Sequence, residues 1–156
     1  MSSSESIYSR LGGELALREF VEQLYGYMAR SAEVEHVRKM HPQDMSHARD
    51  RLFMFLSGLL GGPPLYMTAL GHPRLRRRHM HFQIGNKERD QWLQCAQYAA
   101  DQLDISAQTR EDLMRDLSAV ANHLRNTETA DSATRSGGVG QCNDSRNCAS
   151  NVELSL

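Results

Sequence analysis

Residues 71–85 read GHPRLRRRHMHFQIG and are the most unusual stretch of the chain. It holds three histidines and four arginines within fifteen residues. Pro73 has a fixed φ that suits the first turn of a helix, so we expect a short helix from Pro73 to about Met80. On such a helix Leu75 and His79 are four residues apart and share a face. The stretch therefore predicts one imidazole beside an apolar side chain, with arginines around it.

The composition indicates one domain that has no global affinity for polyanions. The chain has 156 residues, a net charge of −1 at pH 7 and 40% hydrophobic residues. We therefore expect neither nucleic acid nor a membrane as a partner. No apolar run reaches the roughly 20 residues that cross a bilayer, and the first residues lack the pattern of a signal peptide. Three cysteines do not form a disulfide framework, so we expect a cytoplasmic protein.

Apolar residues recur at helical spacing in four long segments, which we expect at residues 14–28, 44–60, 87–103 and 107–125. Asp44 and Asn86 are expected to cap the two middle helices. Shorter helices are expected at residues 4–11 and 31–40, and residues 65–71 are expected to form a connector. The buried faces are predicted to comprise Leu17, Phe20, Val21, Leu24, Tyr25, Met28, Met45, Ala48, Leu52, Phe55, Leu56, Leu59, Trp92, Ala96, Ala99, Leu103, Leu113, Leu117, Val120, Ala121 and Leu124. The fold class predicted from this pattern is all-α, with the folded domain at residues 1–126.

Residues 127–156 differ in composition from the preceding domain. They are rich in Ser, Thr, Gly, Asn and Asp and contain almost no large apolar residue. Such a segment buries too little apolar surface to offset the entropy lost on ordering. We expect a disordered polar tail, and Cys142 and Cys148 within it receive no role.

Four polar side chains are expected to meet inside the domain. The helical pattern sends Tyr25, His79 and Trp92 inward, and His41 lies at a break nearby. A buried polar atom without a partner costs about 1–3 kcal/mol, which a planar metal cofactor with polar ligands would relieve. Spacing alone also fits ordinary core residues. The arginines at residues 74–78 equally fit a solvated face or a phosphate-binding patch.

Several motifs resemble the group II truncated haemoglobins of the bacterial globin family. The resemblance covers about residues 5–126. Its motifs are Tyr8 with Leu11-Gly12-Gly13, Leu24-Tyr25, Gly61-Gly62-Pro63-Pro64-Leu65-Tyr66, Gly71-His72-Pro73-Arg74-Leu75-Arg76, Arg78-His79, Phe82 with Ile84, Glu88-Arg89-Asp90, and Trp92-Leu93. This sequence departs from the family pattern at Arg77, where a smaller or apolar residue is usual, and at His81.

The resemblance implies a truncated globin, a two-over-two helical sandwich around haem b and its iron. It implies His79 as the metal ligand rather than His81, which falls past the expected end of the short helix. The distal ligand pocket implied comprises Tyr25, His41, Ala48, Leu52 and Trp92. The residues implied to contact the haem are Phe55, Leu56, Arg76, Arg78 and Phe82, with the two arginines as partners of its carboxylates.

These residues are compatible with three functions. The first is binding of O2 and other diatomic ligands such as CO and NO, with hydrogen bonds from Tyr25, Trp92 and His41. This function includes redox chemistry on O2, NO or peroxide, for which a reductase donates the electrons. The second is reversible O2 sensing or storage without turnover. The third is a haem-free helical module that binds phosphate or nucleic acid through residues 74–78. The oligomeric state also stays open, a homodimer among the options.

Overall fold

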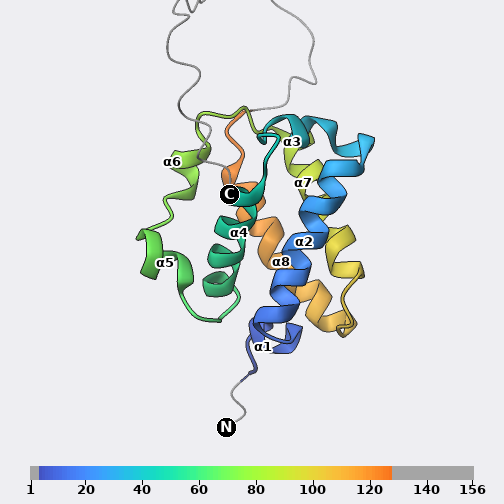
Figure 1. Ribbon diagram of the computed structural model, residues 1–156, viewed down its shortest axis with the longest axis vertical. Coiled ribbons are helices and arrows are strands. Elements are labelled where there is room, and N and C mark those ends of the chain that lie inside the picture. Colours follow the sequence, from blue (N-terminus) through green and yellow to red (C-terminus); the bar gives the residue numbers. More distant parts are fainter. Residues whose placement is uncertain (1–3, 128–156) are drawn as a thin grey trace, which may run out of the picture.

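The computed structural model describes residues 4–127, and this part of the chain is helical with connecting turns and loops (Figure 1). The helices in chain order are α1 Ile7–Leu11, α2 Glu14–Arg30, the 3₁₀ turn η1 Ala32–Val34, α3 Glu35–Lys39, α4 Ser46–Leu59, α5 Leu65–Leu70, α6 Leu75–His79, α7 Asn86–Asp101 and α8 Ala107–Leu124. The predicted all-α class is confirmed. The predicted tail at residues 127–156 lies outside the described residues, apart from Thr127.

Two pairs of long helices form the core. Helix α2 packs against α4 and α7, and α7 packs against α8, so that one pair lies over the other. Each long helix buries one apolar stripe, as on α2, where Leu17, Phe20 and Leu24 are fully buried. The two short helices α5 and α6 lie together at one side of the molecule (Figure 1). None of the described helices is both long enough and apolar enough to span a membrane.

Residues 65–70 form helix α5 instead of the expected connector. Tyr66 explains the difference, because its side chain is 2% exposed and α5 packs on α4. The backbone N–H of Thr68 donates to the carbonyl of Pro64 at 3.1 Å, which closes the first turn. A single turn is too short to show a periodic pattern, so burial of one aromatic residue outweighed the weak sequence signal.

Helix α6 begins at Leu75, two residues later than expected from Pro73. Arg74 adopts a left-handed conformation with φ 46°, which a right-handed helix cannot include. Its backbone N–H is bonded instead to His72 Nδ1 at 3.0 Å. The chain therefore bends at Arg74 before α6 starts, and the helix is only five residues long.

The two expected caps turn out differently. The N-cap of α4 is Met45 and not Asp44, although Asp44 Oδ1 accepts a hydrogen bond of 2.9 Å from the N–H of Ser46, the first residue of the helix. Asn86 is the first helical residue of α7 and is not its cap, which is Gly85. The N–H of Gly85 donates to Glu88 Oε2 at 2.9 Å, so a carboxylate in the first turn satisfies the helix start.

Candidate functional site

A large apolar cavity lies between the helix pairs and the α6 side of the molecule. It encloses about 780 Å³ of empty space, part of which is open to solvent, and its lining is predominantly apolar. Helices α3, α4, α6, α7 and α8 and the segment after α6 all contribute to its wall. The lining residues are Val37, Met40, His41, Leu52, Phe55, Leu56, Leu75, His79, Phe82, Ile84, Glu88, Arg89, Trp92, Leu117, Val120, Ala121 and Leu124.

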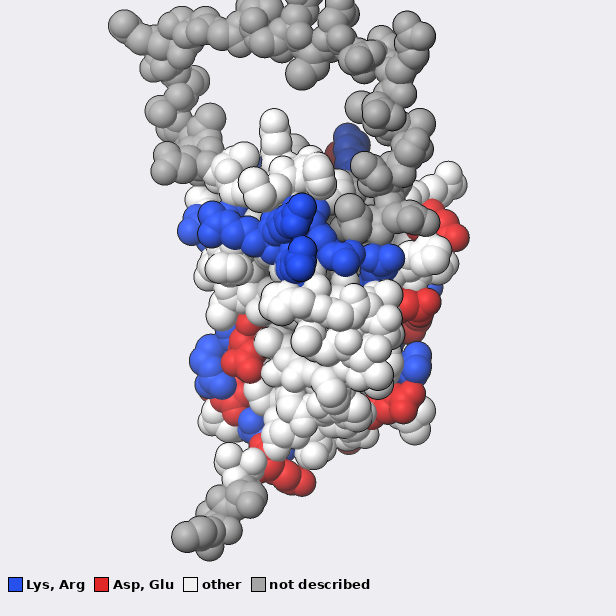
Figure 2. Space-filling view, turned by 90° about the vertical axis from the view of Figure 1, so that its left-hand side faces the viewer, with Lys and Arg blue, Asp and Glu red and all other residues white. Residues whose placement is uncertain are grey.

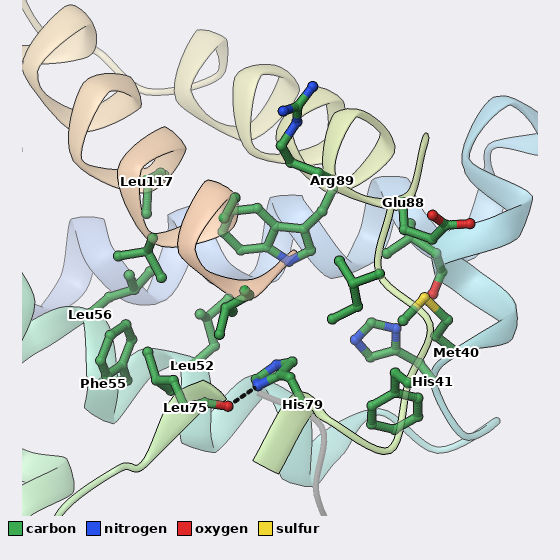
Figure 3. A pocket seen from close by; sticks show the side chains of 17 residues that line it. Met40, His41, Leu52, Phe55, Leu56, Leu75, His79, Glu88, Arg89 and Leu117 are labelled. Atoms are coloured by element: carbon green, nitrogen blue, oxygen red, sulfur yellow. Dashed lines mark hydrogen bonds between the residues drawn. The ribbon is translucent and has the colours of Figure 1, made fainter. Parts of the chain in front are cut away.

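His79 points into this cavity from the last position of α6 (Figure 3). Its Nδ1 lies 2.7 Å from the carbonyl oxygen of Leu75. A carbonyl only accepts hydrogen bonds, so Nδ1 carries the proton and the neutral ring has its lone pair on Nε2. Burial lowers the pKa of His79, although the bond to Leu75 opposes that shift. The ring is therefore held neutral, with one nitrogen available to a Lewis acid.

Asn126, just past the end of α8, holds the segment that carries His79. Its Nδ2 donates to the carbonyl of His79 at 3.0 Å and to that of Phe82 at 2.8 Å. Its Oδ1 accepts from the N–H of Ile84 at 2.9 Å, and its own N–H donates to the carbonyl of Ile84 at 2.9 Å. A five-residue helix is unstable alone, so these bonds substitute for the missing length.

His41 occupies another wall of the cavity, in the segment that follows α3 (Figure 3). Its Nδ1 lies 2.8 Å from the carbonyl oxygen of Val37, so this nitrogen also carries a proton. The ring meets that of Tyr25 edge-on, with 5.8 Å between the ring centroids and an interplanar angle of 76°. His41 therefore lies in the cavity wall with the ring of Tyr25 packed against it.

Tyr25 is fully buried on α2, and its hydroxyl has no hydrogen-bond partner within residues 4–127. A buried hydroxyl without a partner is unfavourable by about 1–3 kcal/mol. Burial raises the pKa of Tyr25 strongly, so the group remains an O–H donor at every physiological pH. The fold thus keeps an unsatisfied donor beside His41.

Seven of the eleven residues singled out from the sequence line the cavity, and four do not. The seven are His41, Leu52, Phe55, Leu56, His79, Phe82 and Trp92. Tyr25 and Ala48 are buried outside the lining. Arg76 is exposed and Arg78 half-buried, and neither belongs to the wall.

Several lining residues were not singled out as site residues. Val120 and Leu124 belong to the apolar stripe of α8, which was expected to pack on other helices and instead faces the cavity in part. Arg89 also lies in the wall, where its Nη1 donates to Asn122 Oδ1 at 3.0 Å and its Nη2 lies 2.7 Å from Asp90 Oδ1. No spacing rule distinguishes such a residue from a surface arginine of a helix.

Comparisons with known proteins agree with this geometry. A sequence model of bacterial-like globins matches residues 6–126. A curated group 2 truncated hemoglobin of Bacillus subtilis is 36% identical over 124 residues, which cover 80% of this chain and 91% of the relative.

Two solved structures are also similar to this chain. A group II 2-on-2 hemoglobin from Agrobacterium tumefaciens has a TM-score of 0.77 and 35% identity, covering 82% of this chain and 98% of that one. A truncated oxygen-avid haemoglobin from Bacillus subtilis has a TM-score of 0.71 and 34% identity, covering 78% of this chain and all (100%) of that one. The predicted two-over-two fold is therefore confirmed. Members of the bacterial-like globin family carry haem iron and bind O2 and other diatomic gases. This chain belongs to that family, as a truncated haemoglobin of group II type.

Proposed function

We propose that the cavity holds haem b and that His79 Nε2 binds its iron, so that the protein binds O2, CO and NO. The observation that carries this proposal is the 2.7 Å hydrogen bond from His79 Nδ1 to Leu75 at the wall of an apolar cavity. This bond leaves Nε2 as the free lone pair and makes the ring more basic, as bonds behind metal-binding histidines do. His72 and His81, the other histidines of the same stretch, are exposed and lie outside the wall.

The residues present fit a haem. The cavity is walled by Leu52, Phe55, Leu56 and other apolar side chains, which suit the faces of a large planar apolar ring. The buried hydroxyl of Tyr25, unsatisfied within residues 4–127, fits a site that receives a polar ligand. Arg76 and Arg78 remain the proposed partners of the haem carboxylates, since both precede His79 on the same short helix α6.

The side chains of this protein would control the ligand as follows. When bound, the haem supplies an iron atom that takes a diatomic ligand and shifts negative charge onto it. Donors already in place stabilise that charge, and we assign this role to the Tyr25 hydroxyl and the Trp92 indole N–H. His41 comes third, because its Nδ1–H is already donated to Val37 and a bond from Nε2 requires the protonated ring. The apolar wall limits access of water.

These donors predict slow release of O2. Each good hydrogen bond to a charged acceptor contributes about 1.5–3 kcal/mol, which corresponds to a factor of about 10 to 100 in the dissociation rate. The similar Bacillus subtilis protein is described as oxygen-avid, which supports the same expectation here. Slow release suits redox chemistry or sensing better than delivery of O2. Turnover of NO or peroxide with an electron-donating reductase is the proposal we favour, and reversible binding without turnover is the alternative.

One experiment tests the ligand assignment. Purified protein, reduced and exposed to CO, should show the Soret band of a histidine-ligated haem, and His79→Ala should lose that spectrum. His81→Ala is the matched control and should keep it. Absence of a Soret band in the wild-type protein would favour the haem-free helical module. A normal spectrum in His79→Ala would disprove His79 as the iron ligand.

A second experiment tests the donors and the turnover. O2 dissociation should be faster in Tyr25→Phe and in Trp92→Phe, and unchanged rates in both would refute the assigned donors. Consumption of NO or peroxide, measured against the same concentration of free haem, separates catalysis from reversible binding. Turnover no faster than that of free haem would favour sensing or storage.

A further inference from the structure

The segment that carries α5 and α6 has a charge opposite to that of the chain as a whole. Residues 51–87 contain six Lys or Arg residues and no Asp or Glu, whereas the whole chain has a net charge of −1. Figure 2 views this side of the molecule and shows a band of basic side chains across it, with acidic side chains below and beside the band. The net charge therefore conceals a strongly one-sided charge distribution.

The arginines before and within α6 have no acidic partners in the described part of the chain. No ion pair within 4.0 Å joins Arg74, Arg76, Arg77 or Arg78 to a carboxylate there, whereas Arg10, Arg18, Arg49 and Arg115 on other helices are all paired. The first carboxylate after this stretch, Glu88, is engaged by the N–H of Gly85. These positive charges are therefore available to a partner.

Exposed apolar side chains accompany the arginines. Met67, Leu70 and Met80 are 52%, 44% and 69% exposed, and they make up most of the large apolar side chains that residues 4–127 leave exposed. We call Met67, Leu70, Arg74, Arg77 and Met80 the α5–α6 surface. It excludes Arg76 and Arg78, which are assigned to the haem.

This composition fits a protein partner better than a nucleic acid. Protein interfaces are enriched in Met and Arg and depleted of Lys, and the α5–α6 surface contains two Met, two Arg and one Leu but no Lys. Nucleic-acid binding depends mainly on phosphate contacts, to which exposed Met and Leu side chains add little. Complementary charge requires that the partner be acidic, and such charge speeds and orients docking.

The position of the α5–α6 surface beside the cavity indicates what kind of protein binds there. Helix α6 carries Arg77 on its exposed side, while its Leu75 and His79 line the cavity. A protein docked on the α5–α6 surface is thus separated from the cavity by a single five-residue helix. We infer that the α5–α6 surface docks a small acidic electron-carrier protein. The electron-transfer role rests on the proposed haem, whereas the docking itself does not.

The transfer itself involves one electron and no bond to carbon, oxygen or nitrogen. The reduced carrier would give up one electron and become oxidised, and the proposed haem would accept that electron at its ferric iron, which would become ferrous. No proton or leaving group moves in this step. A carrier with a [2Fe–2S] cluster is a suitable chemical class, because it transfers single electrons.

The test uses the full-length protein in its haem-loaded form and a small acidic [2Fe–2S] ferredoxin as the probe. Titration calorimetry gives the Kd at several salt concentrations, and the Soret change under CO gives the rate of reduction. Arg74→Glu with Arg77→Glu should weaken binding and slow reduction by about tenfold or more. Lys39→Glu with Arg115→Glu is the control, because it changes the net charge equally at exposed positions on α3 and α8.

The results distinguish failure of the docking inference from failure of the proposed haem function. A Soret band with normal reduction by dithionite in all variants shows that the haem site is intact, and Arg74→Gln with Arg77→Gln gives an intermediate effect if charge is the cause. No measurable ferredoxin binding, equal loss in the control variant, or equal affinity for a small basic cytochrome would overturn the inference. So would tighter binding of an oligonucleotide or of phosphatidylglycerol vesicles with the same dependence on Arg74 and Arg77. Absence of haem with intact ferredoxin binding would refute the proposed function alone.

Discussion

The side-chain amide of Asn126 donates a hydrogen bond of 3.0 Å to the backbone carbonyl of His79, although 47 residues separate them in sequence. The same side chain is also hydrogen-bonded to the backbone of Phe82 and of Ile84. A single residue beyond the end of α8 therefore fixes both ends of the turn that follows α6. Helix α6 has only one turn of its own to hold its shape. The position of His79 in the cavity wall therefore depends on the end of a different helix.

Asn126→Ala should destabilise the protein and loosen the proposed haem site. Loss of three side-chain hydrogen bonds predicts a decrease of about 1–3 kcal/mol in the free energy of unfolding, measured with urea. Transfer of haem to excess apomyoglobin should also become faster. Asn122→Ala, one turn earlier, removes only the bond to Arg89 and should leave haem transfer nearly unchanged. Equal transfer rates in the two variants would contradict a specific role for Asn126.

Tyr25→Phe should raise stability in the absence of haem while it speeds release of O2. The variant removes a buried hydroxyl that has no partner in the described residues, so the free energy of unfolding of the haem-free protein should increase by about 1 kcal/mol. The same hydroxyl is the proposed ligand donor. O2 dissociation should therefore become about 10 to 100 times faster.

Tyr66→Phe is the matched control for this variant. Tyr66 is likewise buried with a hydroxyl unpaired in residues 4–127, but it lies on α5 outside the cavity wall. Its replacement should raise stability and leave O2 dissociation unchanged. If both variants behave alike in the kinetic measurement, Tyr25 has no special relation to the ligand.

Acid should weaken the contact between α1 and α8. Hydrogen bonds from Arg10 first, and then from Gln108 and Arg115, hold the pKa of Asp112 below its usual range. A lowered folded-state pKa contributes stability above the unfolded value of about 4, and that stability is lost as the pH falls through the folded value. The wild-type urea midpoint should therefore fall more between about pH 6 and about pH 3 than that of Asp112→Asn. Asp116→Asn serves as control and should behave like the wild type.

Gly62→Ala and Gly58→Ala should change stability in opposite directions. A Cβ on Gly62 would lie 2.5 Å from Cδ2 of Tyr8, whose ring packs over that backbone, so we expect a loss of about 1–3 kcal/mol. A Cβ on Gly58, within α4, meets only Pro64 Cα at 3.5 Å, an ordinary contact. Helix propensity then predicts a gain of about 0.5–1 kcal/mol. Thermal or urea unfolding distinguishes the two signs, and a stabilised Gly62→Ala would show that Tyr8 moves freely.

Local periodicity was sufficient to predict the four long helices and the shared face of Leu75 and His79, but not the short helix α5. The stripe on α2 appears in the sequence at the positions that the structure buries, and the spacing of Leu75 and His79 produces the bond between them. These features depend on residues three or four apart on one helix, so the amino-acid sequence by itself determined them. The first residue of α6 could not be predicted in this way, because a left-handed conformation at a non-glycine residue such as Arg74 has no sequence signature.

Only the tertiary structure decided which apolar residues pack on each other and which face the cavity. The stripe of α8 contains both kinds, with Leu113 fully buried against other helices and Val120 in the cavity wall. Periodicity reports that a helix face is apolar but not what covers that face. The hydrogen bond from Asn126 to His79 and the position of Arg89 in the cavity wall likewise depend on contacts between helices that are far apart in sequence. Such contacts arise only when the whole chain has packed, because their partners are not neighbours on any single helix.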